Sequence, residues 1–524
     1  MAEYEQINAK KLFNYKRLDL VVKYLYAKEL LEKEGNVYST TCYEDLYVRH
    51  ILMRNMGIEP PDIYGKVSNK QNIEDFDKNF KSLLLSVKNN GYNKNSPIPV
   101  CGNLIANGAH RVAVCATLNM PVYVENAEQG YTWDFDWFCE NGFNTEDKQR
   151  ILKGFVDIHP DKCAIFVVWN PLFKYIDNVK TVINKSFDIV GEVELDFENN
   201  YIAFTNALLE IYEPNISKSN DDTAIREKSK LLQANYLSFK VIVVTNQEKN
   251  SNKAISELSK NCKEEIRNLF THILPKECFC TVHSSDGEDE TKYLASILLS
   301  PNNIKHLKMR NTTETGLNFV HRIRNLPSFL QTIEIFTPDD ICIIGSGVMT
   351  ALGIQNDSAD LDFIIDYKYR DKFGLNAVYL NDDYDIGVCD KVANRPKNIP
   401  DGVLIHNSEY HFWFKGIKFA NLEIIKDRKS FNSRPKDIIH LRQIELFEKS
   451  IGHIEQQKML MERIEAEKQR RTLLIQNVMK NEKIKYSNFL ERIFSVKNEI
   501  SIMKKYKVLT IFGMKIKFKR RNNA

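Results

Sequence analysis

The chain has 524 residues, of which 43% are hydrophobic and 27% are charged, and its formal net charge is +4. With 21 glycines and 15 prolines, this composition excludes collagen-like and low-complexity chains and predicts about three or four globular domains. No apolar run reaches the roughly 18 residues of a membrane-spanning helix, and the first residues (MAEYEQINAKK) lack a secretory pattern, so we expect a cytoplasmic protein. The ten cysteines are scattered, so we expect neither a disulfide framework nor a structural zinc site.

The order of the predicted elements indicates a multidomain chain with α/β and α+β parts. Residues 161–311 alternate apolar runs with helical patterns, which predicts a parallel α/β middle domain. The next segment opens with a strand, a glycine turn and a helix, and it continues as several strands. We therefore divide the chain into a mixed N-terminal domain (1–160), the middle domain (161–311), an α+β domain (312–434), a charged helical region (435–501) and a basic tail (502–524).

A phosphate-binding turn is predicted in the N-terminal domain. The stretch Ser96–Ala116 has the pattern of two short strands followed by a glycine turn that leads into a helix. Gly108 permits the sharp bend, and His110 and Arg111 fall in the first helical turn, where the helix dipole favours phosphate. The planar guanidinium of Arg111 also suits phosphate oxygens.

The same stretch resembles the ParB/sulfiredoxin-like fold. Upstream, Phe76–Gly91 matches a helix of that family and Pro97-Ile-Pro-Val matches one of its strands. Ala109 stands where sulfiredoxin needs a nucleophilic cysteine, which excludes sulfinic-acid reduction, and an α/β domain follows where ParB proteins carry a helix-turn-helix, so a partition role is not expected. In family members that act as small-molecule kinases the turn holds the phosphates of a nucleotide, which implies a catalytic role for His110 and nucleotide binding by Gly108 and Arg111. The alternative is a domain that keeps the fold and only supports its neighbours.

Two smaller features are left open by the sequence. Kinase chemistry needs an acidic base for the acceptor hydroxyl, and the unranked upstream candidates are Glu44, Asp45 and Glu59. His283 ends a predicted strand, where the ligand crevices of parallel sheets lie. Alternatively, Ser285 and Glu288 have the spacing of a capping box and simply start the next helix.

A second candidate site begins at a glycine-rich turn. Ile341–Ile344 is predicted as a buried strand, and Gly345-Ser346-Gly347 leads from it into a helix, so that the backbone can approach an anion. Asp360 and Asp362 follow, two apart in a β pattern, and therefore point to the same face of a strand. Adjacent carboxylates repel each other, and a divalent cation usually compensates them.

The third acid of this site is assigned to Glu423. It is flanked by apolar residues in Ala420–Ile425, which predicts a later strand. The Asn-Asp-Asp composition around Asp382, Asp383 and Asp385 instead predicts a solvated turn. The alternative for the whole group is an acidic strand end at a loop.

A Gly-Ser turn, a D-x-D pair about fifteen residues later and an acid between apolar residues on a later strand together resemble the nucleotidyltransferase superfamily. The residues that carry the resemblance are Gly345, Ser346, Asp360, Asp362 and Glu423. Further on, Arg434-Pro-Lys436-Asp437 resembles the helix that often follows such a core. The resemblance implies that the acids are catalytic and hold a pair of Mg²⁺ ions, that the Gly-Ser turn contacts the nucleotide, and that a nucleoside triphosphate is the donor.

The whole arrangement looks like that of multidomain bacterial proteins from capsule and lipopolysaccharide gene clusters. The Gly-Ala-His-Arg segment, the stretch Tyr410–Phe419 and the ending Ile511–Lys519 carry this resemblance. It implies phosphoryl or nucleotidyl transfer to a sugar, polyol or similar small acceptor. The alternatives are a non-catalytic nucleotide-binding scaffold of the same machinery and a ParB-like nucleic-acid-binding protein.

The basic charge is concentrated at the C-terminus. Residues 503–524 contain eight Lys or Arg and no acid, so the rest of the chain carries a small negative charge and is not expected to bind nucleic acid. The tail alternates apolar and basic residues, which suits the anionic headgroups of an inner membrane or an acidic partner. A solubilised chain end or a basic edge strand is the alternative.

Overall fold

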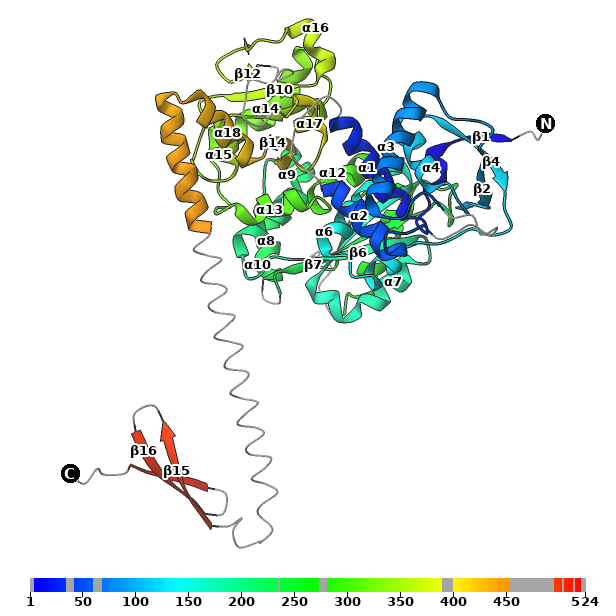
Figure 1. The fold of residues 1–524 in the computed structure, drawn as a ribbon. Helices are drawn as coiled ribbons and strands as arrows, with labels where there is room; N and C mark the ends of the chain where they lie inside the picture. Colours follow the sequence, from blue (N-terminus) through cyan, green and yellow to red (C-terminus); the bar gives the residue numbers. More distant parts are fainter. Residues whose placement is uncertain are drawn as a thin grey trace. The chain divides into compact units, whose positions relative to one another are not determined.

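The computed structural model describes residues 4–33, 42–59, 68–233, 236–272, 280–388 and 399–451, together with the backbone of three strands between residues 494 and 519. Residues 1–444 form one compact unit of mixed α/β structure, whose described residues build three sheets, and residues 445–524 form a second unit (Figure 1). Within these ranges, no helix combines the length and the apolar character needed to cross a membrane.

The first sheet belongs to the N-terminal part of the chain and carries the predicted glycine turn. Its strand order is β1-β4-β2-β3, with β2 parallel to β4 and the other two pairs antiparallel. Helix α4 (Ala109–Thr117) connects β3 to β4, as the strand–turn–helix pattern predicted. The other elements are β1 (Glu5–Asn8), α1 (Asp19–Lys33), α2 (Cys42–Asn55), α3 (Ile73–Asn90), β2 (Ile98–Cys101), β3 (Leu104–Ile105), β4 (Pro121–Asn126), α5 (Phe135–Glu140) and α6 (Thr145–Ile158).

The middle sheet is antiparallel, so the prediction of a parallel α/β domain is wrong. Its order is β6-β7-β5-β8, and every neighbouring pair is antiparallel. The units β5–α7–β6 and β7–α11–β8 each join two parallel strands with a third strand between them, as in a split β-α-β-β-α-β sheet. Strands β6 and β7 are also connected through helices, but they are antiparallel neighbours. The alternation of strand and helix patterns along the sequence shows where helices connect strands. It does not show which strands become neighbours in the sheet. The elements of this sheet are β5 (Cys163–Trp169), α7 (Ile176–Ile183), β6 (Asp188–Asp196), β7 (Ser238–Thr245), α11 (Ile255–Leu269) and β8 (Val282–Ser284).

Helices cover both faces of the middle sheet, which explains why its strands are apolar throughout. Phe166 and its face pack on α7 and α11, whereas Ile165 and the opposite face join a core that includes α1, α6 and the helices α8 and α12. This core extends across the predicted boundary near residue 160. The remaining helices here are α8 (Tyr201–Ile211), α9 (Glu213–Ser219), α10 (Thr223–Leu232), α12 (Glu288–Leu298) and α13 (Pro301–Met309).

The third sheet is mixed and positions the predicted acidic site. Its order is β11-β12-β10-β9-β14-β13, in which β10 is antiparallel to β9 and parallel to β12. The predicted strand, glycine turn and helix are confirmed as β9 and α15. The elements are α14 (Leu317–Thr332), β9 (Ile341–Ile343), α15 (Ser346–Ala351), β10 (Leu361–Ile365), α16 (Arg370–Phe373), β11 (Val378–Tyr379), β12 (Tyr384–Ile386), α17 (Asp401–His406), β13 (His411–Phe414), β14 (Ile417–Ala420) and α18 (Leu422–Asn432).

The C-terminal part contains both helix and strand. Residues 435–451 are helical, but the helical region predicted for 435–501 is wrong at its end, where β15 (Phe494–Ser501) forms. Residues 452–493 lie outside the described part. Strands β16 (Lys504–Ile511) and β17 (Met514–Lys519) complete an antiparallel three-stranded sheet from the alternating basic tail.

Candidate functional site

The glycine turn after β9 brings the backbone against a carboxylate. Gly345 has a positive φ of 74°, a conformation that favours glycine. A Cβ atom at this position would lie 2.5 Å from Oδ2 of Asp362. The glycine therefore serves two purposes, because it permits the turn into α15 and leaves room for the acid on β10.

Three aspartates converge beside this turn. Asp360 precedes β10, Asp362 lies on it, and the parallel register with β12 sets Asp385 opposite Asp362. One carboxylate oxygen from each of the three lies within 4.8 Å of the others. The structure thus brings together the predicted Asp360 and Asp362, but the third acid beside them is Asp385.

Glu423 is not on a strand, which corrects its assignment as the third ligand. Strand β14 ends at Ala420, and Glu423 lies in the first turn of α18. Its side chain is 61% exposed, and its Oε1 lies 3.1 Å from Nζ of Lys305. Apolar neighbours on either side of an acid fit one turn of a helix as well as a strand.

The signal for Asp385 was present in the sequence. Tyr384-Asp385-Ile386 has the same apolar–acid–apolar pattern as the segment around Glu423. The prediction of a solvated turn is wrong for Asp385, because the preceding polar residues form the turn and the strand begins only at Tyr384.

The environment of the cluster disfavours several negative charges at once. Burial, together with the charges of Asp360 and Asp385, raises the pKa of Asp362 to about 6. Burial and the charge of Asp360 also raise the pKa of Asp385, although the amide of Leu380 donates a hydrogen bond that opposes this. A cation among the three carboxylates would relieve this repulsion.

Basic side chains from α18 and the following helix lie near the acids. Lys429 and Lys436 are close enough for their charges to lower the pKa of Asp362, and the charge of Asp362 contributes to raising the pKa of Arg434. Asp437 is fully buried and accepts a 2.7 Å hydrogen bond from Nε of Arg434. Its Oδ1 also lies 3.5 Å from Nζ of Lys429, so this acid holds two of the basic groups.

The three aspartates fit a hard divalent cation. Carboxylate oxygens are the ligands that Mg²⁺ and Mn²⁺ prefer, and burial together with the two neighbouring carboxylates disfavours the charged form of Asp362. A second group, Asp340, Asp366 and His406, also has ligand atoms within 4.8 Å of one another. Its atoms already have protein partners: Asp340 pairs with Lys368 at 2.7 Å, and Nε2 of His406 lies 2.5 Å from Oδ2 of Asp366.

The predicted phosphate turn opens on a small basic cavity. Gly108 caps the N-terminus of α4 with φ of 90°, and a Cβ there would lie 2.7 Å from Ile98. The cavity has a volume of about 300 Å³ and is lined by Arg17, Arg54, Glu59, Lys70, Leu83, Ala106, Asn107, Gly108, Ala109, His110, Arg111 and Trp133. Of the upstream acids left unranked by the sequence, Glu59 is the one that lines it.

Arg111 lines this cavity, and its predicted role as a phosphate ligand stays a prediction. Its Nη1 donates to the carbonyl and hydroxyl oxygens of Ser96, each at 2.6 Å, and to the carbonyl of Pro97 at 3.3 Å. These bonds tie the start of α4 to the segment before β2. The guanidinium therefore has a structural task that the sequence pattern could not show.

His110 lies in an aromatic environment at the edge of the same cavity. Its Nε2 is 3.0 Å from the hydroxyl of Tyr47, and the ring packs against Phe80 at 5.1 Å between centroids. Burial and nearby Lys23, Lys70 and Arg54 lower its pKa well below the usual range. The imidazole is consequently neutral near pH 7, and its predicted catalytic role stays a prediction.

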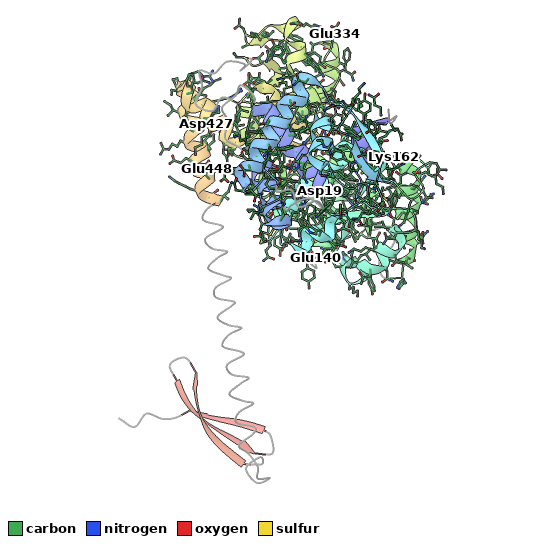
Figure 2. The ribbon with its side chains drawn as sticks, turned by 45° about the vertical axis from the view of Figure 1, so that its right-hand side comes forward. Asp19, Glu140, Lys162, Glu334, Asp427 and Glu448 are labelled. Carbon is green, nitrogen blue, oxygen red and sulfur yellow. The ribbon has the colours of Figure 1, made fainter. Side chains whose placement is uncertain are left out.

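The remaining cations of the cavity differ in how firmly they are held. Arg17 is buried and forms a 2.8 Å ion pair with Asp19 (labelled in Figure 2). Arg54 lies over the ring of Trp133 at 5.1 Å, and Lys70 lies 5.2 Å from the ring centroid of Phe76. Burial lowers the pKa of Lys70. The cavity thus has a basic wall that suits an anionic group.

Comparison of the chain with protein-family models, with curated proteins and with solved structures finds no match. The resemblances to the ParB/sulfiredoxin-like fold and to the nucleotidyltransferase superfamily therefore stay predictions. The functional argument rests on the geometry of the two sites.

Proposed function

We propose that this protein is a metal-dependent phosphoryl- or nucleotidyl-transfer enzyme that acts on a sugar, polyol or similar small acceptor. The observation that supports it is the convergence of Asp360, Asp362 and Asp385 beside the Gly345 turn. An acidic cluster next to a close backbone approach and opposite basic side chains is the arrangement that a metal–triphosphate substrate needs.

In this proposal the acidic residues bind the metal and the basic residues bind the phosphates. Asp360, Asp362 and Asp385 would hold Mg²⁺, which supplies neutralisation of charge on the transferred phosphoryl group when it is bound. Lys436 and Arg434 would bind the outer phosphates of the nucleoside triphosphate. Asp437 would keep Arg434 and Lys429 in position through its ion pairs.

The N-terminal cavity supports a second nucleotide- or phosphate-binding role. Arg54 and Lys70 supply its basic side chains, and the N-terminus of α4 adds backbone N–H groups. Turnover of a nucleotide at this site would make it a kinase centre, and binding without turnover would make it a nucleotide-binding scaffold. The acid that would act as its base is Glu59.

Product analysis tests the transfer reaction. The full chain is incubated with each nucleoside triphosphate, Mg²⁺ and a panel of sugars and polyols, and the products are analysed by mass spectrometry. We expect an acceptor that carries a phosphoryl or nucleotidyl group, with release of nucleoside diphosphate or pyrophosphate. Asp362→Asn should lower kcat/KM roughly 100-fold or more, since metal-bound charge stabilisation contributes several kcal/mol.

Glu423→Gln provides the matched control, because Glu423 is an acid of the same unit that pairs with Lys305 on the surface. It should retain wild-type turnover. Mg²⁺-dependent nucleotide binding without any product would support the scaffold alternative. A wild-type chain that neither turns over nor binds nucleotide with Mg²⁺ contradicts the proposal.

A further inference from the structure

A large cavity in the middle part of the chain is separate from both sites described above. It has a volume of about 1000 Å³ and lies among α9, α10, α11, β8 and α12. His283 on β8 lines it, although the parallel-sheet crevice predicted around this residue is not present, because β8 pairs with β5 in antiparallel direction. The alternative capping box is wrong, because α12 starts after Gly287 without a side-chain cap and the hydroxyl of Ser285 instead accepts from the amide of Ile165 at 3.0 Å.

A buried lysine lies in the wall of this cavity. Lys228 on α10 is 6% exposed, and its Nζ lies 2.7 Å from the hydroxyl of Tyr212. The same nitrogen is 4.3 Å from the ring centroid of Trp169 and 4.8 Å from that of Tyr212. These two aromatic faces fix the position of the amine at the edge of a space large enough for a small organic molecule.

Burial and a neighbouring cation make this amine easy to deprotonate. Burial and the charge of Arg267 lower the pKa of Lys228 to about 7, against an opposing contribution from Cys280. These are two general ways in which proteins activate a lysine as a nucleophile. Tyr212 and His283 are further titratable groups near the amine, and the charge of Lys228 helps to lower the pKa of His283.

We propose that this cavity is a binding site for a small aldehyde or ketone, with the amine of Lys228 as the nucleophile that forms an imine with it. The nitrogen lone pair attacks the carbonyl carbon, and a carbon–nitrogen double bond forms. The carbon–oxygen bond breaks, and the oxygen leaves as water with the two hydrogens that the amine loses. The step needs no oxidant or reductant.

The surrounding groups suit the proton movements of this step. The hydroxyl of Tyr212 is within hydrogen-bond distance of the amine, and the rings of Tyr212 and His283 are 4.8 Å apart. Nε2 of His283 lies 3.3 Å from Oε1 of Glu290. Tyr212 therefore contacts the amine directly, and His283 and Glu290 lie beside it in the wall of the cavity.

Reductive trapping tests the proposal on the full chain. The protein is incubated with glycolaldehyde and sodium cyanoborohydride at pH 7, digested, and mapped by mass spectrometry. Lys230 is the internal control, because it lies on the same helix and is exposed. A pKa of about 7 leaves a large fraction of Lys228 neutral at pH 7, whereas at the ordinary lysine pKa roughly one molecule in a few thousand is neutral. We expect Lys228 to be labelled at least about tenfold faster than Lys230.

Two further readouts separate a binding site from chance reactivity. The labelling rate of Lys228 should saturate with glycolaldehyde concentration and level off above about pH 8. Labelling of the exposed Lys230 should not saturate with glycolaldehyde. Arg267→Gln should move the pH profile of Lys228 upward, because it removes a neighbouring positive charge. Labelling of Lys228 that is no faster than that of Lys230, in protein with an unchanged circular dichroism spectrum, overturns the proposal. Asp362→Asn should label like the wild type, so this outcome is independent of the transfer reaction.

Discussion

Replacing Asp362 by Asn should stabilise the protein in the absence of metal and make it insensitive to Mg²⁺. Asn has nearly the same shape and removes the charge that the folded state disfavours. The pKa of Asp362 is raised in the folded state, so the folded state binds this proton more tightly than the unfolded state does. The contribution of Asp362 to stability therefore falls as pH rises from about 4 to about 6, and the full cost is present at pH 7.5.

The size of the effect follows from the pKa. A rise from 3.8 to about 6 corresponds to a destabilisation of up to about 3 kcal/mol at pH 7.5. Removing this cost should raise the Tm of the metal-free protein by roughly 3 to 6 °C. Mg²⁺ at a hundred times its Kd should instead stabilise the wild type by about 2.7 kcal/mol and leave the variant unchanged.

Thermal unfolding at pH 7.5 and pH 5, with EDTA or with Mg²⁺, measures all four combinations. The difference in Tm between Asp362→Asn and the wild type should be positive in EDTA at pH 7.5 and smaller at pH 5. Glu423→Gln should change Tm little and keep the response to Mg²⁺, because an exposed ion pair contributes about 0–1 kcal/mol. A lower Tm for Asp362→Asn in EDTA, or an equal response of that variant to Mg²⁺, would refute the reasoning.

Two other predictions concern the turns of the two sites. Gly345→Ala should lower stability by about 1–3 kcal/mol and abolish stabilisation by Mg²⁺, since its Cβ would lie 2.5 Å from Asp362. The control Gly374→Ala has a similar positive φ but open space, so it should keep the Mg²⁺ response. Thermal unfolding with and without Mg²⁺ measures both variants, and an equal Mg²⁺ response in the two would contradict the prediction. Arg111→Ala should lower stability by about 1–3 kcal/mol, because it loses its bonds to backbone carbonyls. Arg54→Ala should weaken the binding of ATP, measured by calorimetry, with little change in Tm. Weaker ATP binding in Arg111→Ala and lower stability in Arg54→Ala would instead support the predicted ligand role of Arg111.

The sequence located the acidic site but not all of its members. Spacing alone set Asp360 and Asp362 on one side of a strand, and the glycine turn before them identified where β9 ends. The third acid depended on which segments become neighbours in the sheet. Asp385 lies on a three-residue strand next to a polar turn, and a local pattern that short does not distinguish it from Glu423 on a helix.

Strand direction and side-chain partners could not be predicted from the sequence for similar reasons. Apolar runs such as Cys163–Trp169 report burial on both faces, and they carry no information about the strand inserted beside them. Arg111 has the position expected of a phosphate ligand, yet its partners come from a segment about fifteen residues earlier whose path only the fold fixes. Lys228 gave no signal, because a lysine in a polar helix is usually exposed.

The shared core of the first and middle sheets has a consequence for synthesis on the ribosome. Helix α6 packs against α12, and Gln149 donates a hydrogen bond to the carbonyl of Leu298. The N-terminal part therefore cannot complete its core until the chain has been extended by roughly 140 further residues, which takes about 7–28 s at common translation rates of about 5–20 residues per second. During that interval its apolar helix faces are exposed to other nascent chains, so folding in the cell should depend on chaperones that bind before Leu298 emerges.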